Sequence, residues 1–237
     1  MKNVILIFLF GVLGSYSLCA QEFIFSTTID LNNDNETEAV FVENTTNPFE
    51  FRLSIGKTEV LGKFDDGELD GFKVIDINKY DKYKEIAVHT AGSSDDDEYM
   101  IYWYNGEEII FMDRLSRWPT FKGNGIVYVD GWVGFWTDRD KYVLDDITRK
   151  LKLVEQFAYY VGVTIIVKKG FKIYKEKELI NEVALLSKDS EIELILCDKM
   201  NQLFYEHKYL IKSKSGLLGW ADFKTIEANT TGIQMAD

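Results

Sequence analysis

This chain is organised around the stretch Asp30-Leu31-Asn32-Asn33-Asp34-Asn35-Glu36-Thr37-Glu38, which lies between two strand-like runs, residues 23–29 and 39–42. Side-chain oxygens stand at its first, third and fifth positions, a backbone carbonyl is available at the seventh, and a carboxylate closes the stretch at the ninth. These positions are Asp30, Asn32, Asp34, Glu36 and Glu38. The alternation is the spacing of a calcium-binding loop. We call residues 30–38 the first acidic loop.

The charge of the first acidic loop also favours a metal. It holds four carboxylates and neither Lys nor Arg, so their repulsion must be offset by water or by a hard cation. The alternative is an ordinary solvated turn, since Asp, Asn and Glu are common between strands. The regular alternation and the closing Glu38 favour a structural Ca²⁺.

The N-terminus has the three regions of a secretory signal peptide. Lys2 precedes an apolar run, residues 4–13, and a small polar stretch ends at Ala20, where we expect cleavage. The apolar run is shorter than the ~20 residues of a transmembrane helix, so we expect an exported periplasmic or extracellular protein without a membrane span. Cys19 raises the alternative of a lipid anchor, which Leu18 in front of it disfavours.

Composition limits how the exported chain is stabilised and what it binds. Only Cys197 remains after cleavage, so no internal disulfide forms, and we expect this residue to be buried in a strand. Hydrophobic residues make up 46% of the chain, which is enough for a sizeable core. The net charge of −12 becomes −13 without Lys2, and such a surface repels nucleic acid.

A second acidic loop, residues 76–85, repeats the pattern. Asp76 and Asn78 open it, Asp81 follows, and Glu85 leads into an apolar strand. This copy is one residue longer, has Tyr80 at the fifth position, and carries three lysines against its three carboxylates: Lys79, Lys82 and Lys84. We expect these lysines to replace the metal here, so a Ca²⁺ bound by these four residues is the less favoured alternative.

Paired strands follow each loop. Residues 50–54 and 59–63 flank Gly56-Lys57, and residues 99–104 and 107–112 flank Asn105-Gly106, a strong hairpin signal. A third unit lacks an intact calcium loop; it has strand-like residues 126–129 and 132–136 and an expected turn at residues 137–140.

Together these motifs resemble the FG-GAP or VCBS repeats of integrin-like propeller proteins, in which an Asp-x-Asp/Asn-x-Asp loop between strands holds calcium. The resemblance is good at residues 30–38, partial at 76–85 and faint beyond. It implies an incomplete, propeller-like antiparallel β array over residues 21–158, because a complete propeller needs more blades than this chain supplies.

From about residue 159 short strands continue in a different pattern: 163–167, 171–174, 181–186, 191–197, 209–212 and 219–223. The closing run around Gly219-Trp220 resembles the end of bacterial SH3-like domains, which implies a small β barrel over residues 159–227. Tyr209 and Trp220 then either line a peptide groove or pack across the barrel. Residues 228–237 are polar, and we expect a flexible tail.

Signals for catalysis are weak. The chain has two His residues, His89 and His207, and none of the common nucleophile, zinc or phosphate-loop motifs. His89 follows an apolar run and is expected to be structural. Aromatic residues such as Trp103 could stack sugar rings, or could fill the core. Paired carboxylates for glycoside hydrolysis stay open, because their separation is not visible in a sequence.

The sequence thus predicts an exported, non-catalytic binding protein with a calcium-stabilised β repeat domain and an SH3-like module. The module or an aromatic face would contact a cell-envelope peptide, peptidoglycan or glycan. The alternatives are a secreted carbohydrate-acting hydrolase and a structural module of an envelope assembly.

Overall fold

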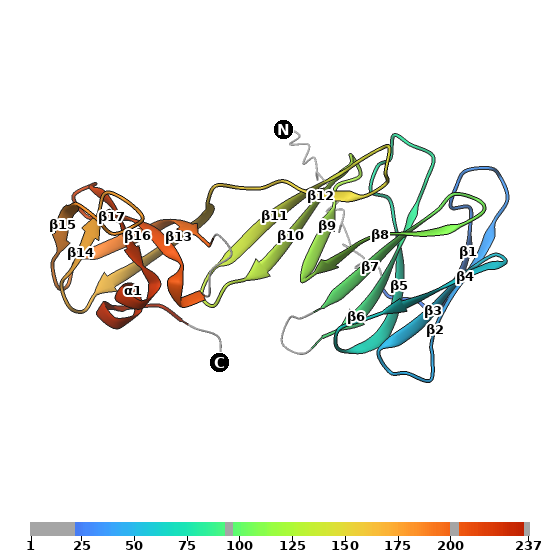
Figure 1. Ribbon diagram of the computed structural model, residues 1–237, viewed down its shortest axis with the longest axis horizontal. Coiled ribbons are helices and arrows are strands. Elements are labelled where there is room, and N and C mark those ends of the chain that lie inside the picture. Colours follow the sequence, from blue (N-terminus) through green and yellow to red (C-terminus); the bar gives the residue numbers. More distant parts are fainter. Residues whose placement is uncertain (1–21, 93–96, 200–203, 235–237) are drawn as a thin grey trace, which may run out of the picture.

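The computed structural model describes residues 22–92, 97–199 and 204–234. The protein is mainly β, with 57% strand and 5% helix, in several antiparallel sheets of which none closes into a barrel. The molecule is elongated, with the β1–β4 sheet at one end and the C-terminal sheet at the other (Figure 1). The prediction of a mainly β, antiparallel chain is confirmed.

The first three sheets each contain four strands that follow one another in chain order. Their strands are β1 (Ser26–Ile29), β2 (Glu38–Asn44), β3 (Glu50–Ile55) and β4 (Thr58–Lys63); β5 (Glu68–Ile75), β6 (Glu85–Ala91), β7 (Glu98–Tyr104) and β8 (Ile109–Ser116); and β9 (Trp118–Phe121), β10 (Ile126–Trp132), β11 (Thr137–Leu144) and β12 (Leu151–Leu153). Tight turns produce this meander, as predicted at Gly56 and Gly106, both of which have a positive φ.

The β5–β8 sheet lies between the other two and is buried on both faces. Successive side chains of a strand point to opposite faces, so Ile86 and Val88 of β6 join the core shared with β1–β4. Ala87 of the same strand and Ile101 of β7 join the core shared with β9–β12. β6 is consequently buried from Glu85 to Thr90, which explains its nearly continuous apolar sequence.

The β10–β11 hairpin corrects one sequence-based expectation. A turn was expected at residues 137–140, but these residues begin β11, and the turn lies at residues 133–136. That turn is apolar: Val133, Phe135 and Trp136 are buried in the core of the C-terminal sheet. Turn residues are usually polar because turns face water, and this one is covered by another part of the protein.

The C-terminal sheet has seven strands in the order β15-β14-β18-β17-β16-β13-β19 and is open, whereas the SH3 resemblance implies a closed barrel. Its elements are β13 (Tyr159–Val167), β14 (Phe171–Tyr174), β15 (Glu182–Leu186), β16 (Glu191–Asp198), η1 (Phe204–Glu206), β17 (Lys208–Ser213), β18 (Leu218–Asp222), α1 (Phe223–Asn229) and β19 (Thr230–Thr231).

Part of the expected flexible tail belongs to this fold. Asp222 caps α1 by accepting the Thr225 N–H at 2.7 Å, and the helix buries Phe223 and Ile226. β19 then pairs with β13. Residues 228–231 are therefore ordered elements, since the helix and strand cover the end of the core. Residues 235–237 lie outside the described residues.

Candidate functional site

The first acidic loop joins β1 to β2 and folds around its own side-chain oxygens. Asp30 accepts hydrogen bonds from two backbone N–H groups of the loop, at 3.3 and 3.0 Å. Asn32 and Asp34 each accept one, at 3.1 and 2.8 Å, the latter from Glu36. Glu38 is buried at the start of β2 and accepts the N–H that follows Asp30, at 3.0 Å. The alternating oxygens therefore hold the loop backbone in a tight coil.

In the part of the chain that the structure describes, the carboxylates of this loop have no cation in direct contact. Within residues 22–92, 97–199 and 204–234, none of its four carboxylates forms an ion pair. The backbone N–H of Glu36 and the Asn32 side chain hold the pKa of Asp34 below its usual value. The charge of Lys82 on the second loop also helps to lower this pKa. The donors are all oxygens, which suits Ca²⁺. However, among the described residues no three Asp, Glu, His or Cys side chains converge closely enough to hold a metal ion.

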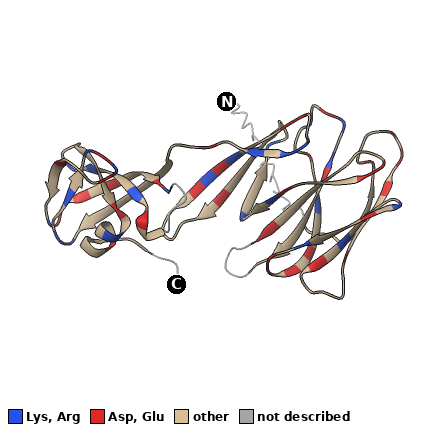
Figure 2. Cartoon of the chain, viewed as in Figure 1, with Lys and Arg blue, Asp and Glu red and all other residues tan. Residues whose placement is uncertain are grey.

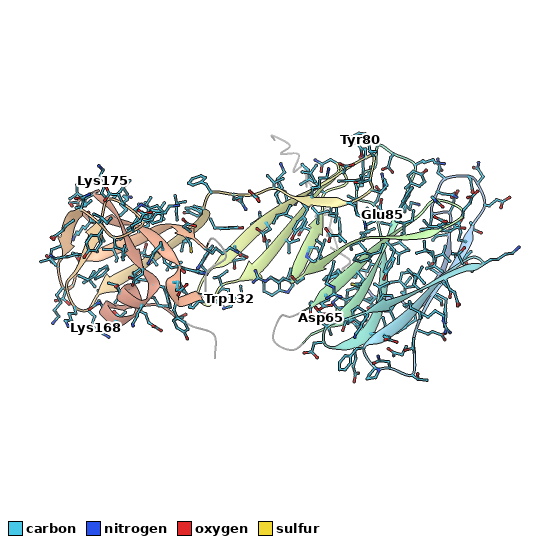
Figure 3. All side chains as sticks on the ribbon, viewed as in Figure 1. Asp65, Tyr80, Glu85, Trp132, Lys168 and Lys175 are labelled. Carbon is cyan, nitrogen blue, oxygen red and sulfur yellow. The ribbon has the colours of Figure 1, made fainter. Side chains whose placement is uncertain are left out.

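The second acidic loop joins β5 to β6 and is paired with a cation from the neighbouring sheet. Its closing carboxylate, Glu85, is fully buried and accepts the Ile77 N–H at 3.1 Å, as Glu38 does in the first loop. The guanidinium of Arg149 donates to Glu85 at 2.6 Å and to Asp81 at 2.7 Å. Tyr80 lies on the outside of this loop, and Glu85 lies within the array (Figure 3).

Arg149, rather than a lysine of the loop, is therefore the balancing cation. Lys79, Lys82 and Lys84 form no ion pair in the described part of the chain, which differs from the expectation. Arg149 comes from the β11–β12 turn and is 6% exposed. Its guanidinium carbon lies 5.3 Å from the ring centres of both Tyr83 and Trp103, which shield it from water.

Burial at this site disfavours the charged form of Glu85. It raises the pKa of Glu85 to about 7, against the opposing effects of the Ile77 N–H and of Arg149. One carboxylate oxygen of Asp76, Oδ1, is buried and has no hydrogen-bond partner among the described residues. Asn78, the fourth predicted ligand, accepts the Tyr80 N–H at 3.3 Å. Two of the four predicted ligands, Asp81 and Glu85, are thus paired with Arg149, and the other two form no ion pair or hydrogen bond with it.

The equivalent turn beside the first loop has no cation. The β7–β8 turn occupies the place in its sheet that the β11–β12 turn occupies in the next. It carries Gly106, and a Cβ built on Gly106 would lie 3.0 Å from the amide nitrogen of Asn32. The β7–β8 turn therefore places a glycine against the first loop, whereas the β11–β12 turn places Arg149 against the second.

The two residues predicted to bind a ligand in the C-terminal part have different surroundings. Tyr209 is fully buried, and its hydroxyl accepts a hydrogen bond from the Trp136 indole N–H at 3.2 Å. This placement matches the packing alternative rather than a groove. Trp220 is half-buried on β18, and the Lys177 ammonium lies 5.3 Å from its ring centre. Its outer surface remains accessible to a ligand.

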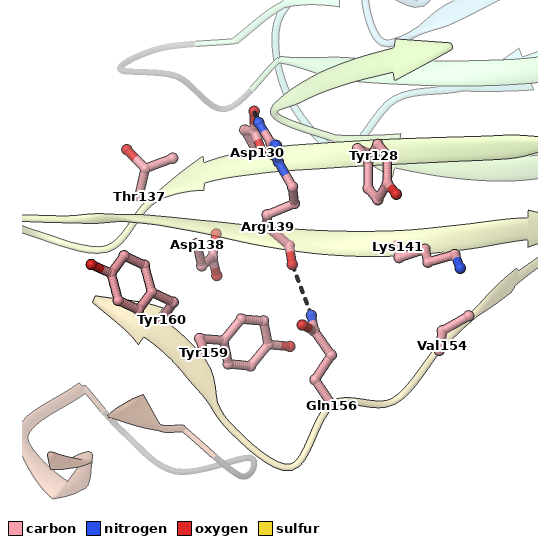
Figure 4. A pocket seen from close by; sticks show the side chains of 10 residues that line it. All are labelled: Tyr128, Asp130, Thr137, Asp138, Arg139, Lys141, Val154, Gln156, Tyr159 and Tyr160. Carbon is pink, nitrogen blue, oxygen red and sulfur yellow. Dashed lines mark hydrogen bonds and ion pairs between the residues drawn. The ribbon is translucent and has the colours of Figure 1, made fainter. Parts of the chain in front are cut away.

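A groove lies where the β9–β12 sheet meets the start of β13 (Figure 4). We call it the tyrosine groove. Its volume is about 620 Å³, and it is lined by Tyr128, Asp130, Thr137, Asp138, Arg139, Lys141, Val154, Gln156, Tyr159 and Tyr160. Tyr160 is 69% exposed, and the other two tyrosines are half-buried. A concave site with aromatic walls and a few polar groups is the usual form of a ligand pocket.

The carboxylates that line this groove are already paired with cations. Arg139 donates to both oxygens of Asp130, at 2.6 and 2.7 Å, and this contact holds the pKa of Asp130 below its usual value. Asp138 is 1% exposed and contacts Lys199 and, at 3.1 Å, Arg117. The lowered pKa of Asp130 disfavours its use as a proton donor at neutral pH.

The sequence pointed to other aromatic residues and missed this groove. Asp130 and Tyr128 lie on one face of β10, and Arg139 and Lys141 lie on the facing side of β11, where charges of both signs alternate (Figure 2). The alternation of polar residues along both strands is the signal that could have indicated an exposed sheet face. The contribution of Tyr159 and Tyr160 depends on the path of the chain after β12.

Two residues with reactive side chains are structural. Cys197 is buried in β16, as predicted, and burial raises the pKa of its thiol to about 12. His89 is buried in β6, stacks on Phe23 at 3.9 Å, and places Nδ1 3.1 Å from Asp70. The acidic run that follows His89 lies partly outside the described residues, at positions 93–96.

No helix in the described ranges is long and apolar enough to cross a membrane. Comparisons with protein-family models, with curated proteins and with solved structures find no match to this chain.

Proposed function

We propose that this chain is an exported, non-catalytic binding protein that holds a cell-envelope glycan or peptide in the tyrosine groove. The observation that carries the proposal is the groove itself, a concave site of about 620 Å³ with three tyrosines and several polar side chains. Its rigid setting supports the same role, because β10 and β11 belong to a four-stranded sheet and are anchored at residues 133–136 in the C-terminal core.

The pairing of the carboxylates supports binding over the alternative of glycoside hydrolysis. Hydrolysis requires one carboxyl group that stays protonated and can donate to the leaving oxygen. Asp130 has a lowered pKa through Arg139, and Asp138 contacts two cations. Asp130 keeps part of its side chain exposed and is suited to orient a ligand by hydrogen bonding, as in a binding site.

We also propose that the fold combines a propeller-like array with an SH3-like module. Three successive four-stranded meanders, each packed on the next, support an incomplete propeller-like array of the FG-GAP or VCBS kind. The order and hairpins of β14 to β18 support an SH3-like module. Export rests on the leader-like residues 1–20.

A structural Ca²⁺ at the first acidic loop is also proposed. Asp30, Asn32, Asp34 and Glu38 would hold it through oxygen, with the Glu36 carbonyl. The comparison with the second loop supports this, because Arg149 of the neighbouring turn pairs with that loop, whereas the turn beside the first loop, residues 105–108, contains no cationic residue. The ion would stiffen the connection between β1 and β2 and take no part in chemistry.

The binding proposal is tested by retention of the purified protein, without residues 1–20, on cell-envelope material. We expect Tyr160→Ala to reduce retention, because it removes the most exposed aromatic ring of the groove. Tyr80→Ala is the matched control, since Tyr80 is a tyrosine outside the groove that is even more exposed than Tyr160. If Trp220→Ala abolished retention and Tyr160→Ala did not, the binding site would lie on the C-terminal sheet and the groove proposal would fail.

A further inference from the structure

The tyrosine groove is less acidic than the molecule as a whole. The protein carries a net charge of −12. The side chains that line the groove or contact its lining include five cations, Arg117, Lys122, Arg139, Lys141 and Lys199, and three carboxylates, Asp130, Asp138 and Asp140. A groove whose lining and neighbours carry two more cations than carboxylates attracts a negatively charged ligand more strongly than the rest of this acidic protein does.

Two of these cations form no ion pair in the described part of the chain. The Lys141 ammonium forms no ion pair with any described residue, although it lines the groove. The Lys122 ammonium lies 5.7 Å from the ring centre of Tyr128 and likewise forms no ion pair in the described ranges. The other three cations are held by Asp130 and Asp138. Lys141 is therefore the cation best placed to meet an anionic group of a ligand.

The exposed ring of Tyr160 provides a different kind of contact. Its hydroxyl lies only 2.6 Å from where a Cβ on Gly162 would stand, so the ring lies against the glycine backbone. The absence of a side chain at position 162 gives the ring room to lie along β13. A tyrosine that is 69% exposed yet supported from below offers a flat apolar surface of the kind on which ring-shaped ligands stack.

The two contacts lie toward opposite ends of the groove. In Figure 4, Tyr160 and Lys141 are separated by Tyr159 and Gln156. The Gln156 amide nitrogen donates to the Arg139 carbonyl at 2.8 Å, which leaves its amide oxygen free to accept from a hydroxyl group. A ligand that reaches both ends needs more than one ring and needs hydroxyl groups between them.

We propose that the tyrosine groove binds an acidic oligosaccharide, a chain of sugar rings that bear carboxylates. One ring stacks on Tyr160, a carboxylate pairs with Lys141, and a hydroxyl between them contacts Gln156. This inference rests on the proposed binding function and names its ligand class. It excludes a neutral glycan as the preferred ligand, because a neutral glycan leaves Lys141 unpaired.

Matched glycans test the ligand class. Calorimetric titration would compare oligomers of uronic acids, such as oligogalacturonate and oligoalginate, with their methyl esters, which keep the rings and lose the charge. We expect at least one acid form to bind about five-fold or more tightly than its ester, as an ion pair of about 1 kcal/mol implies. The preference should shrink as salt is raised, because screening weakens the pair.

Variants of the full mature chain locate the contact. Lys141→Gln should remove the preference for the acid form and leave ester binding unchanged, whereas Tyr160→Ala should weaken both forms by about ten-fold or more. Lys57→Gln, in the distant β3–β4 turn, is the charge-matched control. If no acid form bound better than its ester, or if Lys57→Gln had the same effect as Lys141→Gln, the inference would be overturned.

The same variants separate this inference from the binding proposal. Envelope retention that depends on Tyr160 but not on Lys141 or on salt would overturn the acidic ligand and leave the groove as a binding site. A peptide that bound in the groove more tightly than every uronate would likewise overturn the acidic oligosaccharide and leave the groove as a binding site. Retention unchanged by Tyr160→Ala would instead remove the groove itself.

Discussion

Arg149 shows how one side chain can take the place of a metal ion. It neutralises Asp81 and Glu85 from a neighbouring sheet, and the left-handed backbone at this residue, with a φ of 54°, directs its side chain toward the second acidic loop. A buried carboxylate without such a partner is strongly unfavourable. The contact therefore also joins the β5–β8 sheet to the β9–β12 sheet.

Replacing Arg149 tests this role. Arg149→Met keeps much of the side-chain volume and removes the charge, so we expect the free energy of unfolding at pH 8 to fall by about 3 to 5 kcal/mol. Urea unfolding measures the change. Adding Glu85→Gln to Arg149→Met should recover part of the loss, because no buried charge then remains at that position. A single variant as stable as the wild type would contradict the proposed role.

The raised pKa of Glu85 predicts a particular pH dependence. Its pKa is about 7 in the folded protein and 4.5 in the reference state, so between these values the folded state binds more protons than the unfolded state. Stability must then fall as pH rises from about 4.5 to 7, by about 3 kcal/mol at most. Comparing the wild type with Glu85→Gln over this range isolates the contribution. An identical pH slope in both proteins would contradict it.

At the scale of elements, the two acidic loops share a backbone plan and differ in what balances their charge. In each, the closing glutamate accepts a backbone N–H near the loop entrance, at 3.0 and 3.1 Å. The neighbouring turn then supplies either Gly106 or Arg149. The repeated alternation of oxygens is therefore a property of the loop, and whether an arginine meets the loop depends on the adjacent sheet.

Calcium should stabilise the protein through the first acidic loop. With an affinity typical of extracellular modules, about 10⁻⁴ to 10⁻³ M, 10 mM Ca²⁺ should raise the melting temperature by about 3 to 10 °C. Asp30→Ala combined with Asp34→Ala should abolish this rise. Asp146→Ala with Glu155→Ala removes the same charge at exposed positions elsewhere and serves as the control. A melting temperature unchanged by calcium would remove the metal from the proposal.

At the scale of the whole molecule, the β10–β11 turn makes the repeat array and the C-terminal sheet interdependent. Phe135 stacks with Phe223 at 5.7 Å, and Trp136 donates to Tyr209. The core of the C-terminal sheet thus includes residues that precede the expected domain boundary at residue 158. The tyrosine groove lies beside this connection, so its shape depends on how the two parts are held together.

Truncating Trp136 should loosen the C-terminal sheet more than the array. Trp136→Ala leaves a large cavity and should cost about 3 to 5 kcal/mol, while Trp136→Phe loses mainly the hydrogen bond and should cost about 1 to 2 kcal/mol. Hydrogen exchange of β16 and β17, compared with that of β6, reports where protection is lost. Equal losses in both regions would indicate that Trp136 stabilises the molecule as a whole rather than this connection.

Local patterns in the sequence were enough to locate most strands. Residues 171–174 and the hairpins at Gly56 and Gly106 appear as expected, because strand alternation and turn chemistry act over a few residues. The turn at residues 133–136 escaped the same reasoning, since its apolar residues read as a strand until a second core is present to bury them. The sequence also predicted a closed barrel where the C-terminal sheet is open. Closure depends on the pairing of strands that are distant in the sequence, which local patterns do not reveal.

The sequence by itself determined the β class, the alternating oxygens of the two acidic loops and the burial of Cys197. Only the tertiary structure decided which cation meets the second loop, why Tyr209 is unavailable to a ligand, and where a groove forms. The reason is separation along the chain: Arg149 lies 64 residues from Glu85, and Trp136 lies 73 residues from Tyr209. Such pairs are brought together by the packing of whole sheets, which no local pattern specifies.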